Sequence, residues 1–553
     1  MLSRRAAWAL AAAVAAVLAG YVVWPNLATF RLGLDGALLA DLFGRPRAAG
    51  VRGLVNSVGV SLGTVAGGGA VGTALAWALW RYDVPLRRTL AAVAALPLAL
   101  PPLVGVLAFL FLYGESGMLP RGLQAALGLE AVPFAFGGVG AVLAVHVYVF
   151  YVYFYLFVGA ALRDLDGSLL DASADLGAGP WTTFRRVVLP LLRPALVGAS
   201  LLVFMLSMAS FTAPLLFAEG EPFLTTQIYQ YKTNGALDRA AAVSVILTAI
   251  CLVFLVGAER GGGAGAGRAA GGAGKGVGRR PAPLRGGPAR ALAGALVAVF
   301  LVVVLLPVAT VVLLSFVAEG TWTTQALPDT FTLANYAALA TEPDVFAPIA
   351  SSLWMAALAT AANVVFGVAT ALVVVQGAVP GRGVLRALAL LPFAVPGTVI
   401  ALGLVVAFDE PTALAGGAVL VGTVWLLPLA YFVRHVPLVV RSAQAALEGF
   451  DDRLGEASAD LGAGPWTTFR RVVLPAIVPG VVAGALLTFV TALGEFVASI
   501  MLYVYANRPI AVEVFSQLRV YEFGQAAAYS VLLMALVAAA VGVSRAVGGA
   551  RVG

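Results

Sequence analysis

Long uncharged hydrophobic runs, separated by short polar stretches, set the pattern of this 553-residue chain. Runs such as 92–113 and 291–317 reach the roughly 20 apolar residues that a helix rising about 1.5 Å per residue needs to cross a bilayer core. A transmembrane β-strand would instead alternate apolar and polar residues. Segments such as LVVVLLP at 301–307 do not alternate, so the pattern predicts membrane-spanning helices.

Twelve hydrophobic runs, six in each half of the chain, are long enough to be spans. The first half holds runs at 6–24, 54–80, 91–113, 133–162, 192–218 and 240–257. The second half holds runs at 289–317, 348–379, 384–408, 414–440, 477–505 and 524–547. The first run follows Arg4 and Arg5 and also resembles a secretory signal peptide. We expect a retained span instead, because the run at 289–317 occupies the same place in the second half.

The composition supports an integral membrane protein. Hydrophobic residues make up 61% of the chain, charged residues make up only 11%, and the mean hydropathy is +0.96. A soluble domain has about 25% charged residues and far fewer apolar ones. The sequence therefore predicts an all-α integral membrane protein with about twelve spans, built as two tandem six-helix units.

Basic residues indicate the orientation, because Lys and Arg are retained in short cytoplasmic loops. With the amino terminus in the cytoplasm, the outer loops hold nine of the 34 Lys and Arg residues: Arg31, Arg45, Arg47, Arg52, Arg121, Lys232, Arg239, Arg508 and Arg519. The remaining basic residues then lie inside or at the inner helix ends. This bias explains the net charge of +7 without nucleic acid, and it predicts a multi-pass membrane protein with a cytoplasmic amino terminus.

The chain divides into two similar units joined by a linker. We predict a first transmembrane unit at 1–257, a flexible Gly/Arg-rich cytoplasmic linker at 258–288 and a second transmembrane unit at 289–553. The repeated segments include LPLALPP at 96–102 with LPFAVPG at 391–397, and AAAVSVIL at 240–247 with AAAYSVLL at 526–533. Six is an even number of spans, so both units enter the membrane in the same sense. They can pair about a pseudo-two-fold axis along the membrane normal.

One polar stretch is repeated without change. ASADLGAGPWTTFRRVVLP occurs at 172–190 and again at 457–475, and the charge bias puts both copies in the cytoplasm. Capped loops that anchor the chain would explain about half of these residues, and a recent duplication would also produce identity. The simplest explanation for nineteen unchanged positions is that both loops contact the same external surface.

The residue types in the repeat predict a helix, a turn and a second helix. Ser168 with Asp171 fits a capping box, and Gly177 fits a helix stop. Pro180 suits the first turn of the next helix, where its missing N–H would be unpaired anyway. The arginine pairs that follow mark the inner membrane boundary: Arg185, Arg186, Arg470 and Arg471.

The same stretch resembles the cytoplasmic signature of permease subunits of bacterial ATP-binding cassette importers. That signature is Glu-Ala-Ala, three residues, Gly, nine residues, Ile, one residue and Leu-Pro. The second copy matches at Glu456, Ala457, Gly462, Val472, Leu474 and Pro475, and the first at Asp171, Ala172, Gly177, Val187, Leu189 and Pro190. Ser in place of the second Ala, Val in place of Ile and Asp171 in place of Glu are mild departures. Similarity to the fused two-unit permeases for ferric iron and thiamine covers nearly the whole chain.

The resemblance implies that each loop is a coupling helix seated on a cytoplasmic ATPase subunit. It implies two ATP-binding subunits and an extracytoplasmic solute-binding protein as partners. The residues carried over are, in the first loop, Asp171, Ala172, Gly177, Pro180, Arg185, Leu189 and Pro190, and in the second, Glu456, Ala457, Gly462, Pro465, Arg470, Leu474 and Pro475. The segment at 223–247 is most similar to ferric-iron permeases.

The sequence contains no match to the phosphate-binding motif of an ATPase. A phosphate-cradling loop needs Gly, four residues, Gly-Lys and then Ser or Thr. The nearest match, Gly274-Lys275, is preceded by Ala269 in place of the first Gly and followed by Gly276. We therefore expect no enzymatic activity and no cofactor, with ATP hydrolysis on another chain.

Candidates for the solute path are few. Glu495 lies in an apolar run, where an acid is costly and usually faces a cavity or a partner. It either lines the path or pairs with Arg508 or a backbone group, and its counterpart 285 positions earlier is Ser210. His146 is expected to be a hydrogen-bonded packing residue, and we predict no metal site, because Cys251 is the only cysteine.

Two other classes remain open. An ion-driven secondary transporter also uses parallel six-span repeats, but the two matched loops and the shortage of buried acids argue against it. A membrane-embedded enzyme lacks grouped catalytic residues. Within the importer class, ferric iron leads thiamine, polyamines, phosphonates and sulfate-like anions as the expected solute.

Overall fold

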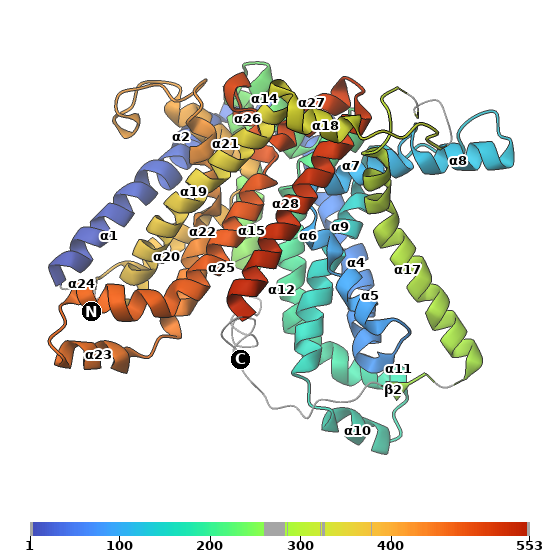
Figure 1. The fold of residues 1–553 in the computed structure, drawn as a ribbon, viewed down its shortest axis with the longest axis horizontal. Coiled ribbons are helices and arrows are strands. Elements are labelled where there is room, and N and C mark those ends of the chain that lie inside the picture. The colour runs from blue at the N-terminus through green and yellow to red at the C-terminus, as the bar shows by residue number, and fades with distance from the viewer. Residues whose placement is uncertain are drawn as a thin grey trace.

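The computed structural model describes residues 4–258, 282–284, 286–320, 322, 327–377 and 379–549. Helices dominate this part of the chain (Figure 1). The named strands in it are β1 (Tyr82–Asp83) and β2 (Ala282–Pro283), which pair in parallel. The predicted all-α membrane fold is therefore confirmed. Most of the predicted linker, with Gly274-Lys275, lies outside the described residues.

The first half contains the following helices: α1 (Arg4–Leu18), η1 (Ala19–Val23), α2 (Trp24–Gly33), α3 (Gly36–Phe43), α4 (Ala49–Arg81), α5 (Arg87–Val93), α6 (Leu96–Ala99), α7 (Pro102–Tyr113), α8 (Met118–Leu127), α9 (Gly138–Arg163), α10 (Ser168–Asp175), α11 (Pro180–Thr183), η2 (Phe184–Val188), α12 (Leu189–Met208), α13 (Thr212–Phe217), α14 (Leu224–Thr233) and α15 (Leu237–Ala258).

The second half contains α17 (Gly287–Leu314), α18 (Ala334–Thr341), α19 (Pro343–Gln376), α20 (Arg382–Leu390), η4 (Leu391–Phe393), α21 (Gly397–Phe408), η5 (Ala413–Ala415), α22 (Leu426–Glu448), α23 (Asp452–Asp460), α24 (Pro465–Thr468), η6 (Phe469–Val473), α25 (Leu474–Leu493), α26 (Val497–Leu502), η7 (Tyr505–Asn507), α27 (Ile510–Arg519) and α28 (Phe523–Gly549).

The number of spans differs from the twelve predicted. In the described residues, ten helices are long and apolar enough to cross a membrane, or eleven if the bent pair 382–393 and 397–408 is one span. The predicted run at 414–440 corresponds to α22, which begins only at Leu426 and carries Arg434 and Arg441. Gly416, Gly417 and Gly422 have positive φ angles, a backbone conformation that breaks a helix, so the helix starts later than hydrophobicity alone suggests.

The third span of each half is broken at proline. Pro101 and Pro396 have extended backbones directly before α7 and α21. Proline has no N–H to donate and clashes with the preceding helical turn. In the second half the two segments meet at an angle of 108°, and the first residue after this break is Gly397.

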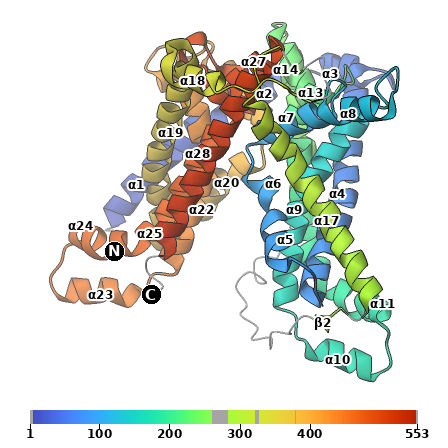
Figure 2. The same cartoon turned by 45° about the vertical axis from the view of Figure 1, so that its right-hand side comes forward.

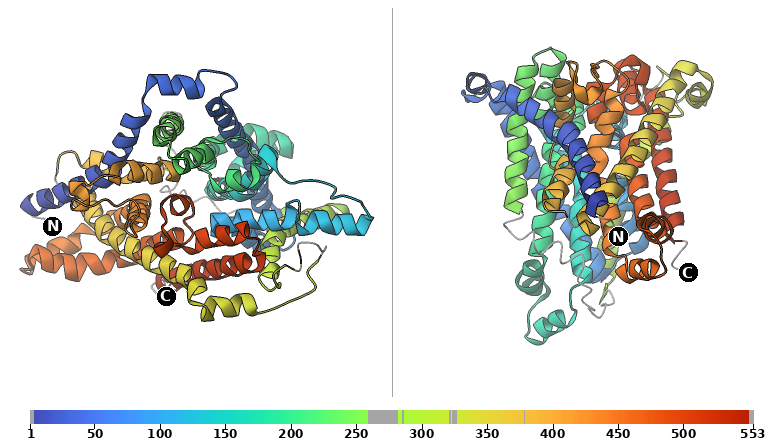
Figure 3. Two further views of the ribbon diagram at one scale, coloured as in Figure 1. Left: turned by 90° about the horizontal axis from the view of Figure 1, so that it is seen from above. Right: turned by 90° about the vertical axis from the view of Figure 1, so that its left-hand side faces the viewer.

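The two halves exchange their first long helices. Helix α1 packs against α19 and α20 of the second half, whereas α17 packs against α5 and α7 of the first. Figure 2 shows α17 beside the helices of the first half, and Figure 3 shows α1 beside those of the second. The largest buried hydrophobic cluster draws residues from both halves, so the core lies along their interface.

Several short helices lie at the two ends of the molecule. Helices α10 and α23 lie at the lower end in Figure 1, together with both chain termini. Helices α8, α14, α18 and α27 lie at the upper end. The repeated stretches thus share one end of the molecule with the amino terminus, as the sequence predicts.

Candidate functional site

An aspartate accepts an equivalent backbone hydrogen bond at the start of α10 and at the start of α23. Asp166 accepts a hydrogen bond from the backbone N–H of Ser168 at 3.0 Å, and Asp451 accepts one from Arg453 at 3.1 Å. The two aspartates are 285 residues apart in the sequence, and so are the two residues that donate to them. The predicted capping box of Ser168 with Asp171 is wrong: Ser168 is the first residue of α10, and its helix receives no side-chain cap from Gly167 before it. The aspartate two residues earlier takes the exposed N–H instead.

A glycine in the left-handed region ends each of these helices, as predicted. Gly177 has φ +75° and Gly462 has φ +81°. In the first loop, Gly177 N–H donates to Ala174 at 2.8 Å and Ala178 N–H donates to Ser173 at 3.0 Å. The second loop repeats both bonds, at 2.9 and 3.1 Å. This pair of bonds is the Schellman arrangement, which satisfies the last carbonyl groups of a helix and reverses the chain.

A hydroxyl pair holds each short helix to the helix that follows the turn. Ser173 Oγ lies 2.9 Å from Thr183 Oγ1, and Ser458 Oγ lies 2.9 Å from Thr468 Oγ1. The second helices begin at Pro180 and Pro465, which confirms the predicted placement of proline in the first turn.

Large apolar side chains are exposed to solvent on both loops. Leu176 is 88% exposed and Leu461 is 89% exposed, and Trp181 and Trp466 are both 70% exposed. The carried-over residues Asp171, Ala172, Glu456 and Ala457 are exposed beside them. Bare Leu and Trp side chains at one end of a membrane protein favour a protein interface, where aromatic residues are enriched. The local geometry and the exposure agree between two segments far apart in the chain.

The arginine pairs and the Leu-Pro steps come next in the chain. Arg185 and Arg470 are exposed in the π-helical turns η2 and η6. Leu189 with Pro190, and Leu474 with Pro475, open the long helices α12 and α25. The repeated stretch therefore runs from the exposed turn into a membrane-spanning helix in both halves.

The two solute-path candidates lie at the interface between the halves. Ser210 and Glu495 precede Phe211 and Phe496, whose ring centroids are 6.0 Å apart. In the first half, His146 Nε2 is 2.8 Å from Ser210 Oγ and His146 Nδ1 is 3.0 Å from Ser207 Oγ. His146 is thus a buried, hydrogen-bonded packing residue, as predicted.

Glu495 has a partner that the sequence did not suggest. Its Oε2 is 2.7 Å from Arg434 Nε, and its Oε1 accepts a hydrogen bond from Ala498 N–H at 3.0 Å. The suggested pairing with Arg508 is wrong, because Arg508 Nε lies 2.5 Å from Glu513 Oε2. The suggested backbone partner is present. Arg434 itself was detectable as an arginine within the predicted run at 414–440.

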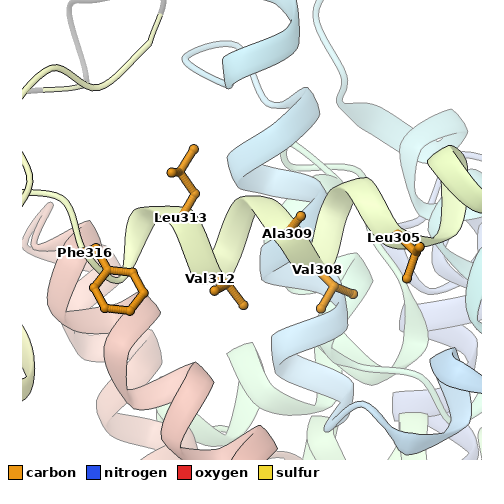
Figure 4. Close-up of a pocket in the computed structure, with 6 residues that line it drawn as sticks. All are labelled: Leu305, Val308, Ala309, Val312, Leu313 and Phe316. Atoms are coloured by element: carbon orange, nitrogen blue, oxygen red, sulfur yellow. The ribbon is translucent and has the colours of Figure 1, made fainter.

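Two further findings concern a metal site and an apolar groove in the described part of the chain. No group of three or more metal-binding side chains was found in it. A shallow groove on α17 is lined by aliphatic and phenyl groups, which hold no hydrogen-bond donor or acceptor (Figure 4): Leu305, Val308, Ala309, Val312, Leu313 and Phe316. Such a groove suits lipid chains.

Comparison with known protein families gives two matches along the chain. A family model described as "Binding-protein-dependent transport system inner membrane component" matches residues 68–258 and 363–548. Each matched region contains one of the two repeated loops and the helices on both sides of it.

Several individual proteins are also similar. The "Probable ABC transporter permease protein y4fN" of Sinorhizobium fredii is 31% identical over 439 residues, which cover 78% of this chain and 76% of that protein. The "Ferric transport system permease protein FbpB" of Actinobacillus pleuropneumoniae is 27% identical, over 80% of this chain and 63% of that protein. The "Sulfate transport system permease protein CysT" of Escherichia coli is 33% identical, over 36% of this chain and 76% of that protein.

Among solved structures, one similar chain comes from a bacterial ABC transporter involved in the import of the acidic polysaccharide alginate. The two chains are 16% identical with a TM-score of 0.36, and the match covers 46% of this chain and 95% of that chain.

Proposed function

This chain belongs to the family of binding-protein-dependent transport system inner membrane components, and from this premise we propose that its two repeated loops couple solute import to ATP hydrolysis on partner subunits. The chain is a multi-pass inner-membrane permease of an ABC importer and is not itself an enzyme. Membership of the family implies ATP-binding and solute-binding partners. Nothing in this family match favours an ion-driven secondary transporter.

The agreement between the two loops carries this proposal. Cap, glycine turn, hydroxyl pair and exposed leucine recur at a spacing of 285 residues. Neighbouring helices differ in sequence between the halves, so packing inside the chain does not require identical loops. Two like sites fit two ATP-binding subunits, one on each loop, and closure of those subunits on ATP would draw the loops together and rock the halves.

The orientation follows from the same assignment. ATP-binding subunits are cytoplasmic, so α10 and α23 face the cytoplasm, and the amino terminus lies at their end of the molecule (Figure 1). The excess of basic residues on this side agrees with the positive-inside rule. The solute-binding protein then docks on the opposite end, near α8, α14, α18 and α27.

Ferric iron is the solute we propose. The ferric permease of Actinobacillus matches over 80% of this chain, whereas the sulfate permease of Escherichia coli matches over 36% of this chain and 76% of its own length. Thiamine, polyamines, phosphonates and sulfate-like anions remain alternatives served by the same mechanism. The solute passes along the interface between the halves, near Ser210 and Glu495.

Uptake by reconstituted transporter tests this function. The chain is assembled with its ATPase and binding protein in liposomes, and the binding protein is loaded with ferric iron, thiamine, putrescine or sulfate. We expect ATP-dependent uptake of ferric iron and no uptake with a non-hydrolysable ATP analogue. Uptake of another solute would replace iron and keep the mechanism, whereas uptake that follows an ion gradient without ATP would contradict the importer assignment.

A further inference from the structure

Glu495 and Arg434 form an ion pair, but they are not equally available to a solute. Both carboxylate oxygens of Glu495 are engaged, one by Arg434 Nε and one by Ala498 N–H, and the residue is buried. Arg434 uses only its Nε in this pair, and its side chain is 27% exposed. No acceptor for its two Nη groups was found in the described part of the chain. The accessible charge at this place is therefore positive.

The guanidinium group lies directly on the start of α21. A Cβ atom added to Gly397 would lie 1.6 Å from Arg434 Nη1, so the arginine occupies the space that any other residue would fill. Gly397 is the first residue of α21, where the first backbone N–H groups have no partner within the helix; Val399 N–H already donates to the Pro396 carbonyl at 3.0 Å. Helix starts also carry partial positive charge. A positive side chain beside such a start is unfavourable unless an anion lies between them.

An unpaired hydroxyl adjoins the same turn. Thr398 is fully buried, and its Oγ1 has no hydrogen-bond partner in the described residues. A buried polar atom without a partner is uncommon, because its desolvation is not compensated. This place thus offers hydrogen-bond donors from Arg434, the first turn of α21 and Thr398. The nearby carboxylate of Glu495 is already paired.

The first half of the chain lacks this arrangement. The residue 285 positions before Arg434 is Val149, and the residue that matches Gly397 in the repeated LPLALPP and LPFAVPG segments is Pro102. Proline has no N–H, and its ring takes up the space beside the backbone. A duplicated fold therefore carries the cluster of donors once, which is expected of a solute contact and not of a shared structural need.

We propose that Arg434 and the first turn of α21 form an anion-binding subsite on the solute path, which binds an oxyanion or carboxylate group of the passing solute. This inference rests on the proposed import function and names the class of solute. Glu495 is a positioning residue that orients the guanidinium through Nε and leaves Nη1 and Nη2 toward the solute. Guanidinium groups match carboxylate, sulfate and phosphate oxygens with two parallel hydrogen bonds.

Two solutes present this chemistry. One is a free oxyanion such as sulfate, and the other is ferric iron that still carries an anionic oxygen ligand such as citrate. A bare ferric ion would be repelled by Arg434, since like charges in a medium of low dielectric interact strongly. The subsite therefore predicts that iron, if it is the solute, passes as an anionic complex.

Equilibrium binding of radiolabelled sulfate to the full chain in lipid nanodiscs tests the subsite. We expect saturable binding at constant ionic strength that citrate displaces and chloride does not. Arg434→Gln and Gly397→Ala each weaken it about tenfold or more, the value of a charge-assisted hydrogen bond. Arg434→Lys retains part of the affinity. Glu495→Gln retains binding, because the amide oxygen of Gln can still accept from Arg434 Nε and keep the guanidinium in place, while a competing negative charge is removed.

The set of variants separates a solute contact from a structural ion pair. If the ion pair were only structural, Arg434→Gln and Glu495→Gln would weaken sulfate binding equally, and the double variant would regain binding. Either result would overturn the proposal. So would the absence of saturable sulfate binding by the folded wild-type chain, or an Arg434→Gln variant that binds as the wild type does. Melting temperatures of the variants report whether each one folds.

Uptake in proteoliposomes distinguishes the two sources of the anionic group. Labelled sulfate and labelled ferric citrate are presented separately to transporter assembled with its partners, and Arg434→Gln is expected to reduce uptake of whichever one is carried. Unchanged uptake by Arg434→Gln in an active transporter contradicts the subsite. Failure of the import function has a different signature: the wild type then transports neither solute, and sulfate binding to the chain alone still decides the inference.

Discussion

Single glycines decide the shape of the two loops. Gly462 has φ +81° and no atom within 4 Å of the place where a Cβ would lie, so a side chain there meets backbone strain and no steric neighbour. Gly464, two residues later, has φ −67° and equally open space. The pair separates the effect of backbone conformation from that of bulk.

We predict that Gly462→Ala destabilises the turn after α23 by roughly 1 kcal/mol, because an L-residue is disfavoured in the left-handed region. Gly464→Ala is the matched control and should change little. Hydrogen exchange of the α23 amides measures the difference. Equal protection in the two variants would show that the positive φ does not hold the turn.

At the scale of the residue, the sequence predicts local chemistry better than long-range pairing. The glycine stop and the proline start were predictable because each depends on the residue's own backbone preference. The partner of Glu495 could not be predicted in this way. Arg434 is 61 positions away on another helix, and no periodicity in the sequence connects the two. Only the packing of α22 against the break between α25 and α26 brings them together.

At the scale of the element, the cap of α10 is sensitive to acid. The backbone and side-chain hydrogen bonds from Ser168 hold the pKa of Asp166 below its ordinary value of 3.8. A carboxylate with a lowered pKa in the folded state stabilises that state above its ordinary pKa. The contribution is lost as the pH falls through the lowered value.

We therefore predict that α10 frays in acid, as the pH falls through the lowered pKa of Asp166 and its carboxylate takes up a proton. Amide exchange of α10, corrected for the intrinsic effect of pH, should rise in this range. Asp166→Asn keeps a neutral acceptor and should lack the acid-dependent step. An identical acid response in this variant would assign the fraying to another group.

Hydrophobicity predicted the existence of most long helices but not all of their boundaries. The described spans at 49–81, 138–163 and 287–314 contain or overlap the runs predicted from the sequence. Helix α22 is the exception, since glycines with positive φ delay its start and two arginines lower its hydropathy. The sequence signal for a span is therefore weak in the helix that carries Arg434 and Arg441.

At the scale of the whole molecule, the exchange of first helices ties the halves together. Helix α1 packs on α19 and α20, and α17 packs on α5 and α7. The sequence predicted two tandem units, yet it held no sign of this exchange, because apolar faces of spans do not specify their partners. Each half thus completes the packing of the other.

We predict that the halves remain associated after the chain is cut in the predicted linker. A protease site inserted at 262–280 is cleaved in lipid nanodiscs, and the two fragments should co-elute in size-exclusion chromatography and retain the melting temperature of the intact chain. Removal of residues 1–33 before cleavage takes α1 away from the second half and should weaken this association. Separation of the fragments on cleavage alone would contradict the interlocked packing.

The central claim is that both repeated loops couple the chain to its ATP-binding subunits. The measurement that tests it most directly is ATP hydrolysis by the reconstituted complex, stimulated by solute-loaded binding protein. It compares Leu176→Asp, Leu461→Asp and the double variant with Leu176→Met, a control that keeps an apolar side chain at the same exposed place. The account predicts that each loop variant removes most of the stimulation, that the double variant removes all of it, and that the control keeps it. Full stimulation in either loop variant, with the complex assembled, would contradict the account.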